Sequence, residues 1–308
     1  MATMTETPET MSTEIKYEHM YHAEAHVLSG ELERPIEQKI EKHAPVALKD
    51  LRGAHLTRST QDISIEGLIS YKRGHTRVSG SRSRKHQGWV TLSTSILEGL
   101  NVFEIVTADR VVAQLSTDHL PDNRYVPRVT FLGTQFNGIR LSGFPINLEI
   151  DLGICGDKPA GDRPYLEESS FLRRIREQAE TLSGTIAKAK DLPVGIKDQY
   201  DKRLATINEL ISHSLNGNGK ASVTCSLVKS IDIRNAPIPG LRTVGNLLLI
   251  PEFGTVALGE LEVGIEPMTG FTRPSNYFTL RMVDIVLGCV GHGTVQGGGG
   301  SVNGGTRP

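Results

Sequence analysis

The amino-acid sequence predicts a mostly β fold, an antiparallel sandwich or open barrel-like body, with an antiparallel α-helical hairpin inserted into it. The first observation is a series of short apolar runs between residues 243 and 287, bounded by Gly and Pro, as expected of strands buried on both faces. The second is a period-two alternation of apolar and polar residues across 62–150. The third is a change to spacings of three and four residues between 165 and 215, which indicates helices.

Composition sets limits on the class of protein. The chain has 308 residues, enough for one large β domain or two ordinary ones. Its net charge of −1 favours neither nucleic acid nor an anionic membrane as a partner of the whole chain. Aromatic residues make up 5%, which argues against a deep aromatic-lined pocket. No run of apolar residues is long enough to predict a membrane span.

The N-terminal residues 1–16 are rich in Thr, Glu and Pro and predict a disordered or arm-like segment. No signal peptide is readable there, so a cytoplasmic location is expected by default. The three cysteines, Cys155, Cys225 and Cys289, are far apart and form no C-x-x-C motif, which argues against a zinc knuckle. Whether any of them pair stays open.

Three histidines fall within residues 17–28, at positions His19, His22 and His26. In a helix these three would share one face, whereas in a strand His22, Glu24 and His26 would share one face. Imidazoles and a carboxylate suit Zn²⁺, so one hypothesis is a metal site at His22, Glu24 and His26. The favoured interpretation is an exposed polar face in contact with water.

The next segments are less uniform. In 31–50, Ile36 and Ile40 lie four residues apart after Pro35, which predicts a short helix ended by Pro45. Residues 62–71 alternate strictly and predict a half-buried strand.

A basic segment, Lys72–His86, follows this strand and contains no acidic residue. Its candidate ligand-binding residues are Lys72, Arg73, Arg77, Arg82, Arg84 and Lys85. One hypothesis is a loop that binds phosphate, sugar or nucleic acid. The favoured alternative is a solvated hairpin loop, or a basic surface that faces an acidic patch on a neighbouring subunit. Aromatic residues for base stacking are missing, which disfavours nucleic acid.

Residues 88–116 predict three successive strands, and the Asn137-Gly138 turn within 128–150 predicts a hairpin. We expect 17–156 and 220–289 to form one β-rich body. Within 165–215, two apolar seams of similar length predict an antiparallel helical hairpin. Because each seam is narrow, we expect the helices mostly to bury each other and to project from the β body or lie lightly on it.

The last strand, near residues 278–287, changes the phase of its alternation after Met282, which predicts a β-bulge or a strand that passes from one sheet environment to another. Residues 290–308 are Gly-rich, with Val295 and Val302 at intervals. This composition predicts a flexible tail, or an extended arm that pairs with a neighbour's sheet edge and places the two valines in shallow pockets.

Several β segments share motifs with a known family. They are VFEIVTADRVVAQLST with its V-T-A-D strand, TFLGTQFNGIRLSGFPINLEIDLG with a Gly-flanked hairpin, GNLLLIPEFGTVALGELEVG with a strand pair, and TLRMVDIVLGCVGHGTV with a closing apolar strand that ends in Gly. Over about half the chain this succession resembles bacterial choice-of-anchor P proteins. The resemblance implies a surface or secreted β protein of unsettled function, hence an extracellular location. The helical hairpin departs from the family pattern.

No catalytic or cofactor-binding motif is found, so we expect neither an enzyme nor a cofactor. The favoured hypothesis is a structural protein, a self-assembling subunit of a filament or surface layer, that forms a homo-oligomer or polymer through β edges and terminal arms. One alternative is a binding module that uses the basic segment 72–86. Another is a metal-dependent hydrolase at the 19–26 histidine cluster.

Overall fold

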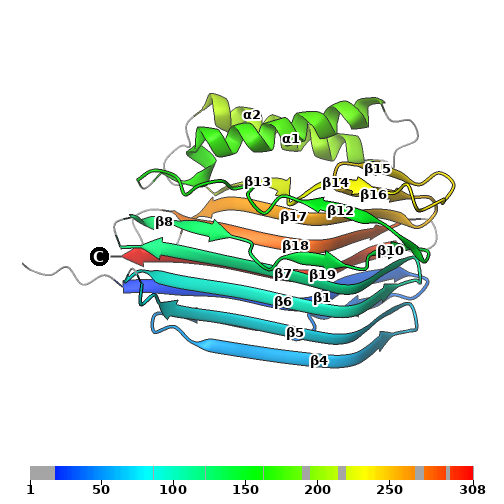
Figure 1. Cartoon of the computed structure of the whole chain (residues 1–308), viewed down its shortest axis with the longest axis horizontal. Coiled ribbons are helices and arrows are strands. Elements are labelled where there is room, and N and C mark those ends of the chain that lie inside the picture. Colours follow the sequence, from blue (N-terminus) through cyan, green and yellow to red (C-terminus); the bar gives the residue numbers. More distant parts are fainter. Residues whose placement is uncertain are drawn as a thin grey trace, which may run out of the picture.

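A computed structural model describes residues 18–85, 87–121, 123–161, 163–188, 195–213, 220–267, 274–288 and 292–307. Two antiparallel sheets face each other as a sandwich, and two helices lie along one side of it (Figure 1). The predicted fold class, mostly antiparallel β with a helical insertion, is confirmed. Predictions for residues 1–16 and for Cys289 lie outside the described residues. No helix in the described part of the chain has the length and hydropathy of a membrane span.

Sheet A runs in the order β15-β16-β17-β18-β19-β1-β2, with β13 added on β17 and β3 on β1. Its strands are β1 (Glu18–Arg34), β2 (Gln38–Ile40), β3 (Val46–Asp50), β13 (Ala221–Ser226), β15 (Arg242–Val244), β16 (Leu247–Ile250), β17 (Gly254–Glu266), β18 (Ser275–Leu287) and β19 (His292–Arg307). Segments from both ends of the chain therefore build one sheet.

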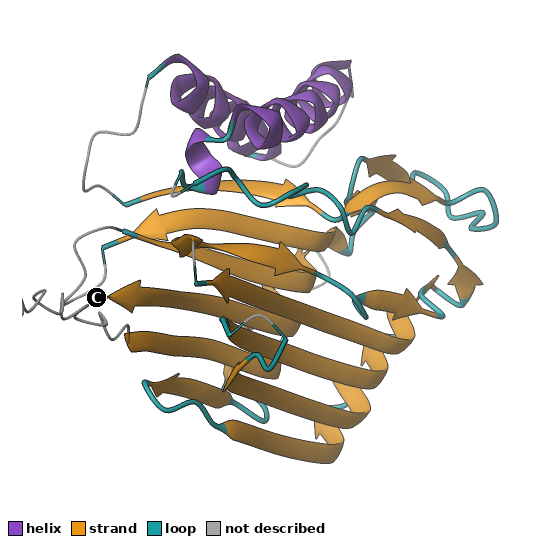
Figure 2. Ribbon diagram, turned by 60° about the vertical axis from the view of Figure 1, so that its left-hand side comes forward, coloured by secondary structure: helices purple, strands orange, loops and turns teal. Residues whose placement is uncertain are grey.

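Sheet B runs in the order β11-β10-β7-β6-β5-β4, with β8 and β9 added on β7. Its strands are β4 (His55–Ile65), β5 (Ile69–Arg82), β6 (Trp89–Val102), β7 (Val106–Leu120), β8 (Asn123–Thr130), β9 (Gln135–Asn137), β10 (Arg140–Leu141) and β11 (Phe144–Pro145). A separate small sheet pairs β12 (Asn147–Ile150) with β14 (Val228–Asp232). Figure 2 shows the strands within the two large sheets lying next to one another.

The short helix predicted within 31–50 is wrong, because this segment forms the end of β1 followed by β2 and β3. Ile40 is buried and pairs with Gly30 across the β1–β2 ladder. Two isoleucines four residues apart fit a helix face, but the edge of β1 was available as a pairing partner and decided the conformation.

The prediction of a Gly-rich tail or arm at 290–308 is wrong for the described residues 292–307. These residues form β19, which lies between β18 and β1 in the interior of sheet A. Val295 and Val302, the predicted assembly residues, are 1% and 0% exposed and belong to the core. Composition alone predicts flexibility, whereas here the missing side chains let a strand fit where the two sheets approach closely.

The close approach is visible in the atoms around the glycines. A Cβ added to Gly80 on β5 would lie 2.5 Å from the Tyr21 ring, and one on Gly300 would lie 2.8 Å from Ser93 Oγ. The Ser93 hydroxyl donates to the Glu24 carbonyl at 2.6 Å, so a side chain of sheet B reaches the backbone of sheet A. Small residues therefore fill this part of the sandwich in place of a thick apolar layer.

The pairing of strands is interrupted at single positions in both sheets. The pairing on either side of β18 skips Met282, which faces Gly259 (φ 63°) and Gly298 (φ 67°). The register is the same before and after Met282, so the change of phase in burial occurs without the extra residue of the predicted β-bulge. In sheet B the β6–β7 pairing skips Gly99 (φ 67°), and the β4–β5 pairing skips Asp62 (φ 51°). The strands of sheet B bend together near this line, at the right of Figure 1.

The helical hairpin consists of α1 (Ser169–Lys188) and α2 (Ile196–Ser212), preceded by the short helix η1 (Tyr165–Glu167). It does not project from the sandwich. Phe171 of α1 joins the main core together with residues of both sheets, and Leu182 packs with Val244 and Leu247 of sheet A. The described seam residues of α1 are buried as expected, whereas Ile211 in the seam of α2 is 44% exposed. Phe171 lies outside the predicted seam and widens the apolar face, so α1 covers sheet A as well as α2.

Charged groups hold α2 against sheet A. Arg203 of α2 contacts Glu260 of β17 at 2.8 Å, and Arg281 of β18 lies 3.7 Å from the same carboxylate. Glu260 is buried, so it depends on these cations for compensation of its charge. The ion pairs fix the position of α2 along the strands more specifically than apolar contacts do.

The close approach of the sheets predicts a strong response to one methyl group. Gly80→Ala should lower the free energy of unfolding by about 1–3 kcal/mol, because the new Cβ overlaps the buried Tyr21 ring. Gly184→Ala is the matched control, since no atom lies within 4 Å of its added Cβ in α1, and it should raise stability by up to about 1 kcal/mol. Urea denaturation of both variants checks this. Equal stability of the Gly80→Ala variant and the parent would contradict the packing described.

Candidate functional site

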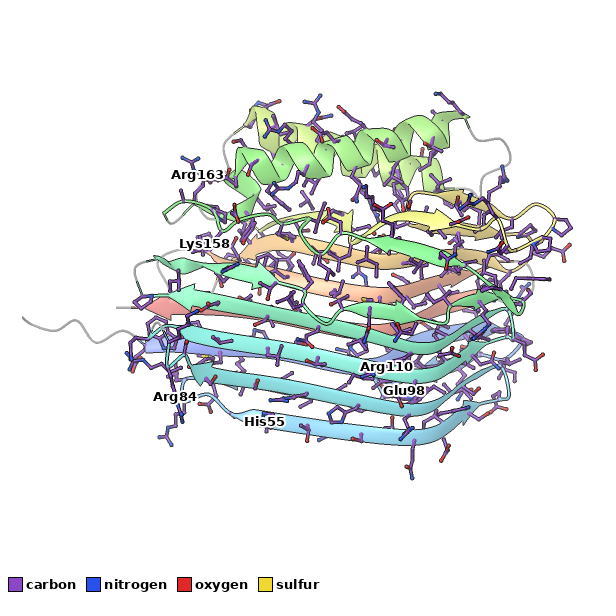
Figure 3. The ribbon with its side chains drawn as sticks, viewed as in Figure 1. His55, Arg84, Glu98, Arg110, Lys158 and Arg163 are labelled. Carbon is purple, nitrogen blue, oxygen red and sulfur yellow. The ribbon has the colours of Figure 1, made fainter. Side chains whose placement is uncertain are left out.

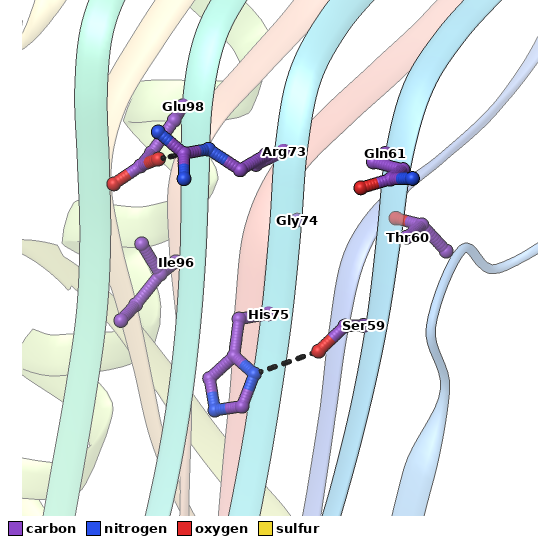
Figure 4. Close-up of a pocket in the computed structure, with 8 residues that line it drawn as sticks. All are labelled: Ser59, Thr60, Gln61, Arg73, Gly74, His75, Ile96 and Glu98. Atoms are coloured by element: carbon purple, nitrogen blue, oxygen red, sulfur yellow. Dashed lines mark hydrogen bonds and ion pairs between the residues drawn. The ribbon is translucent and has the colours of Figure 1, made fainter.

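The outer face of sheet B carries an open groove of about 490 Å³ across β4, β5 and β6 (Figure 4). Its walls and floor come from Ser59, Gln61, Arg73, His75, Ile96 and Glu98. These side chains share one face because they lie at alternating positions of adjacent antiparallel strands, where successive residues point to opposite faces. The opposite face of β5 and β6 packs into the sandwich.

One wall of the groove is charged. Glu98 on β6 accepts ion pairs from Arg73 Nε at 3.2 Å and from Arg110 Nε on β7 at 3.8 Å. The Arg73 side chain is 77% exposed, so this wall presents a guanidinium to solvent. A surface pair of this kind contributes little to stability, which leaves it available for binding.

A Ser–His pair lies on the floor of the groove. Ser59 Oγ and His75 Nδ1 are 3.0 Å apart, and Figure 4 shows the two side chains facing each other. Activation of a serine requires a histidine that a third group orients. Among the described residues, the second ring nitrogen of His75 makes no hydrogen bond that would orient it. The pair therefore offers a hydroxyl and an imidazole to a ligand.

The predicted basic loop at 72–86 is a strand along most of its length. β5 continues to Arg82, and only the turn that follows, with Arg84 and Lys85, is a loop. Lys72, Arg73 and Arg77 are exposed on β5, whereas Arg82 Nε donates to the Gln87 carbonyl at the turn. The alternation of buried and exposed positions in this strand is hard to see in the sequence, because the exposed positions are strongly basic and the buried positions include Gly and Thr.

The strand alternative for the histidine cluster is the one observed. His22, Glu24 and His26 lie on the face of β1 that turns away from the sandwich. His22 Nε2 is 3.5 Å from Glu24 Oε1, and His26 Nε2 is 3.2 Å from Ser29 Oγ. Across the described residues, no three His, Cys, Asp or Glu side chains come together as metal ligands. On this face Glu24 is exposed, while His22 and His26 are half-buried, and the described residues give the metal hypothesis no cluster.

A second cleft, also of about 490 Å³, lies between α1 and the β12–β14 pair. Its polar side chains are already engaged with each other. Glu149 accepts from Lys229 Nζ at 2.9 Å and from Ser230 Oγ at 3.0 Å, and these hydrogen bonds lower the pKa of Glu149. Gln178 makes two hydrogen bonds with the backbone of Ser226. This cleft joins the hairpin to the sheets, and we regard the groove on sheet B as the better ligand site.

Both described cysteines, Cys155 and Cys225, are buried and free. Burial raises the pKa of both thiols, that of Cys225 to about 12, so they are protonated at neutral pH and are poor nucleophiles.

Two buried histidines join the sheets at one end of the sandwich. His19 of β1 and His119 of β7 have ring centroids 4.6 Å apart, and His19 stacks on Trp89 of β6 at 5.3 Å. Burial lowers the pKa of His19 to about 2 and that of His119 to about 3. Both rings are therefore neutral at physiological pH.

Sequence reasoning found Arg73 but missed Ser59, Gln61, His75 and Glu98. The sequence does contain one signal for them, the alternation of polar residues in 55–61 and in 73–81. This alternation places Ser59 and Gln61 on one face of their strand and Arg73 and His75 on one face of theirs. The partners across the strands depend on the β4–β5–β6 register, which no motif in the sequence specifies.

The family model described as Domain of unknown function (DUF8256) matches residues 19–264. The match ends within β17, before β18 and β19. No curated protein and no solved structure matches the chain. The family description names neither an activity nor choice-of-anchor P proteins, so that resemblance stays an expectation.

The buried histidines predict acid lability. Their pKa values lie below the ordinary 6.5, so below about pH 6.5 the unfolded chain takes up protons that the folded chain refuses. Stability should fall as pH decreases from 6.5, by about 1.4 kcal/mol per pH unit for each histidine. Urea denaturation between pH 7 and pH 5 measures the slope.

A His119→Gln variant should show a shallower pH dependence, whatever its stability at pH 7, and the exposed His55→Gln variant provides the control. An unchanged slope in the His119→Gln variant would contradict the assignment.

Proposed function

We infer that this chain, which belongs to the family described as a domain of unknown function (DUF8256), is a non-enzymatic structural protein that associates with copies of itself through the free edge of β4. The observation that supports this proposal is the position of β4 at the end of sheet B. It pairs with β5 on one side and leaves the backbone groups of its other side without a strand partner among the described residues.

This edge is long and poorly protected. β4 spans 11 residues and is exposed over most of its length, including the apolar Leu56. It contains no proline, and its devices against pairing are the charge of Arg58 and the break in pairing at Asp62. Natural proteins usually shorten or cover such an edge, because it is a template for another strand. The terminal strands β15 and β2 on sheet A are only three residues long.

The favoured partner is a second copy in an antiparallel arrangement. Pairing of β4 with β4 of another molecule uses the same surface on both, so the contact closes on itself and gives a two-fold dimer. Growth into a filament would need a second surface. The C-terminal strand and its valines do not supply one, since they lie inside the sandwich. A single pair of strands is a small interface, so we expect reversible, concentration-dependent association.

Proline substitutions test the edge. Thr57→Pro and Arg58→Pro remove neighbouring N–H groups, and in an antiparallel strand one of two neighbours points toward β5 and the other away from it. The variant that loses the outward N–H should be monomeric with an unchanged far-UV spectrum, whereas the other should lose stability. Sedimentation velocity over a concentration series measures association. A parent protein that stays monomeric at high concentration, or two proline variants that both dimerise, would refute the proposal.

A further inference from the structure

The outer face of sheet B concentrates positive charge in a chain whose net charge is −1. The strand register arranges its side chains in rows that cross β4, β5, β6 and β7. The rows are Gln61, Arg73, Glu98 and Arg110; then Ser59, His75 and Ile96; then Thr57, Arg77, Thr94 and Gln114. These rows hold three arginines and a single carboxylate.

Arg77 differs from the other two arginines in its surroundings. Its cross-strand neighbours are the neutral Thr57 and Thr94, and within the described chain it has no ion pair. Arg73 contacts Glu98 through Nε, so its terminal nitrogens still face solvent. The row of Ser59, His75 and Ile96 lies between these two arginines. The row of Ser59, His75 and Ile96 therefore has an arginine in the row on either side of it, Arg73 in the lining of the groove and Arg77 in the row beside the groove.

The shape favours an extended ligand over an enclosed small molecule. The groove is open to solvent and crosses neighbouring strands, which are about 4.8 Å apart. Hydroxyl, amide and imidazole groups of Ser59, Gln61 and His75 point into it and can donate to or accept from ligand hydroxyls. Figure 3 shows Glu98 and Arg110 on the broad face of the sheet, away from the helices.

The lining contains no Phe, Tyr or Trp. Single-stranded nucleic acid is usually held by bases stacked on such rings, and neutral sugars would gain no stacking here either. An anionic polymer with many hydroxyls matches the polar groups of the groove, because guanidinium groups bind carboxylate and sulfate through charge-assisted hydrogen bonds.

We propose that this groove binds an acidic polysaccharide, with Arg73 and Arg77 contacting its anionic groups and Ser59, Gln61 and His75 contacting its hydroxyls. The proposal goes beyond self-association and does not depend on it, since pairing at the edge of β4 leaves the outer face of the sheet open. Carboxylate and sulfate share the chemistry that arginine recognises, so the experiment includes a polymer of each kind.

Binding of the full chain to polygalacturonate, heparin, neutral dextran and single-stranded DNA is measured by affinity electrophoresis at low and at high salt. At least one acidic polysaccharide should bind at low salt and be weakened at high salt, and dextran should not bind. The Arg73→Gln/Arg77→Gln double variant should lose about tenfold or more in affinity. The Lys188→Gln/Lys202→Gln variant on the exposed face of the helical hairpin removes the same charge and should bind like the parent.

All four substituted side chains are exposed, so a loss of binding by the arginine variant at unchanged thermal stability reports on the groove. Three results would overturn the proposal: no acidic polysaccharide binds at low salt, the lysine and arginine variants lose affinity equally, or single-stranded DNA binds as tightly as the best polysaccharide. Sedimentation of the arginine variant should match that of the parent, which separates this proposal from the one concerning β4.

Discussion

The small distance between the two sheets is the constraint on which the rest of the structure depends. Where β1 and β19 face β5 and β6, the contact is made by glycines and by the hydroxyls of Ser93 and Ser95, which donate to the carbonyls of Glu24 and His26. A side-chain hydroxyl that donates a hydrogen bond to the backbone of the opposite sheet fixes both the distance between the two sheets and their position relative to each other. An apolar layer alone would allow the sheets to slide.

This constraint explains why the composition of residues 290–308 was misleading. Gly-rich sequence is typical of linkers because an isolated chain of this kind has little to bury. In this fold the side chains that become buried around β19 belong mostly to the neighbouring strands. The glycines of β19 contribute because they leave space for those side chains. By contrast, the change of phase at Met282 could be predicted, since a shift in an apolar pattern is local information, and Met282 and Val283 are both buried. The helix–sheet contact at Phe171 required knowledge of which face of α1 meets sheet A.

The candidate groove, like the fold, could be predicted from the sequence only in part. The alternation of 55–61 and 73–81 tells which side chains share a face of one strand, and that much can be read from the sequence. Which residue of β4 lies opposite which residue of β5 follows from the turn at 66–68, because the register is constant along the pair and a single-residue shift at the turn would move every partner. Basic residues that look like one loop in the sequence are therefore divided between the groove face and the turn at Arg84.

The pairing of β1 with β19 also governs when the protein can fold. The partner of the strand at 18–34 is the strand at 292–307, so the intervening residues and this second strand must leave the ribosome before sheet A can close around its first member. Until then β1 remains a long strand without its main neighbour, and its residues Ala23 and Val27 lack the burial they have in the finished molecule. Contacts between such distant positions slow the search for the native state. Sheet B, whose main strands follow one another in sequence, has no such delay and can provide the surface on which the late strands assemble.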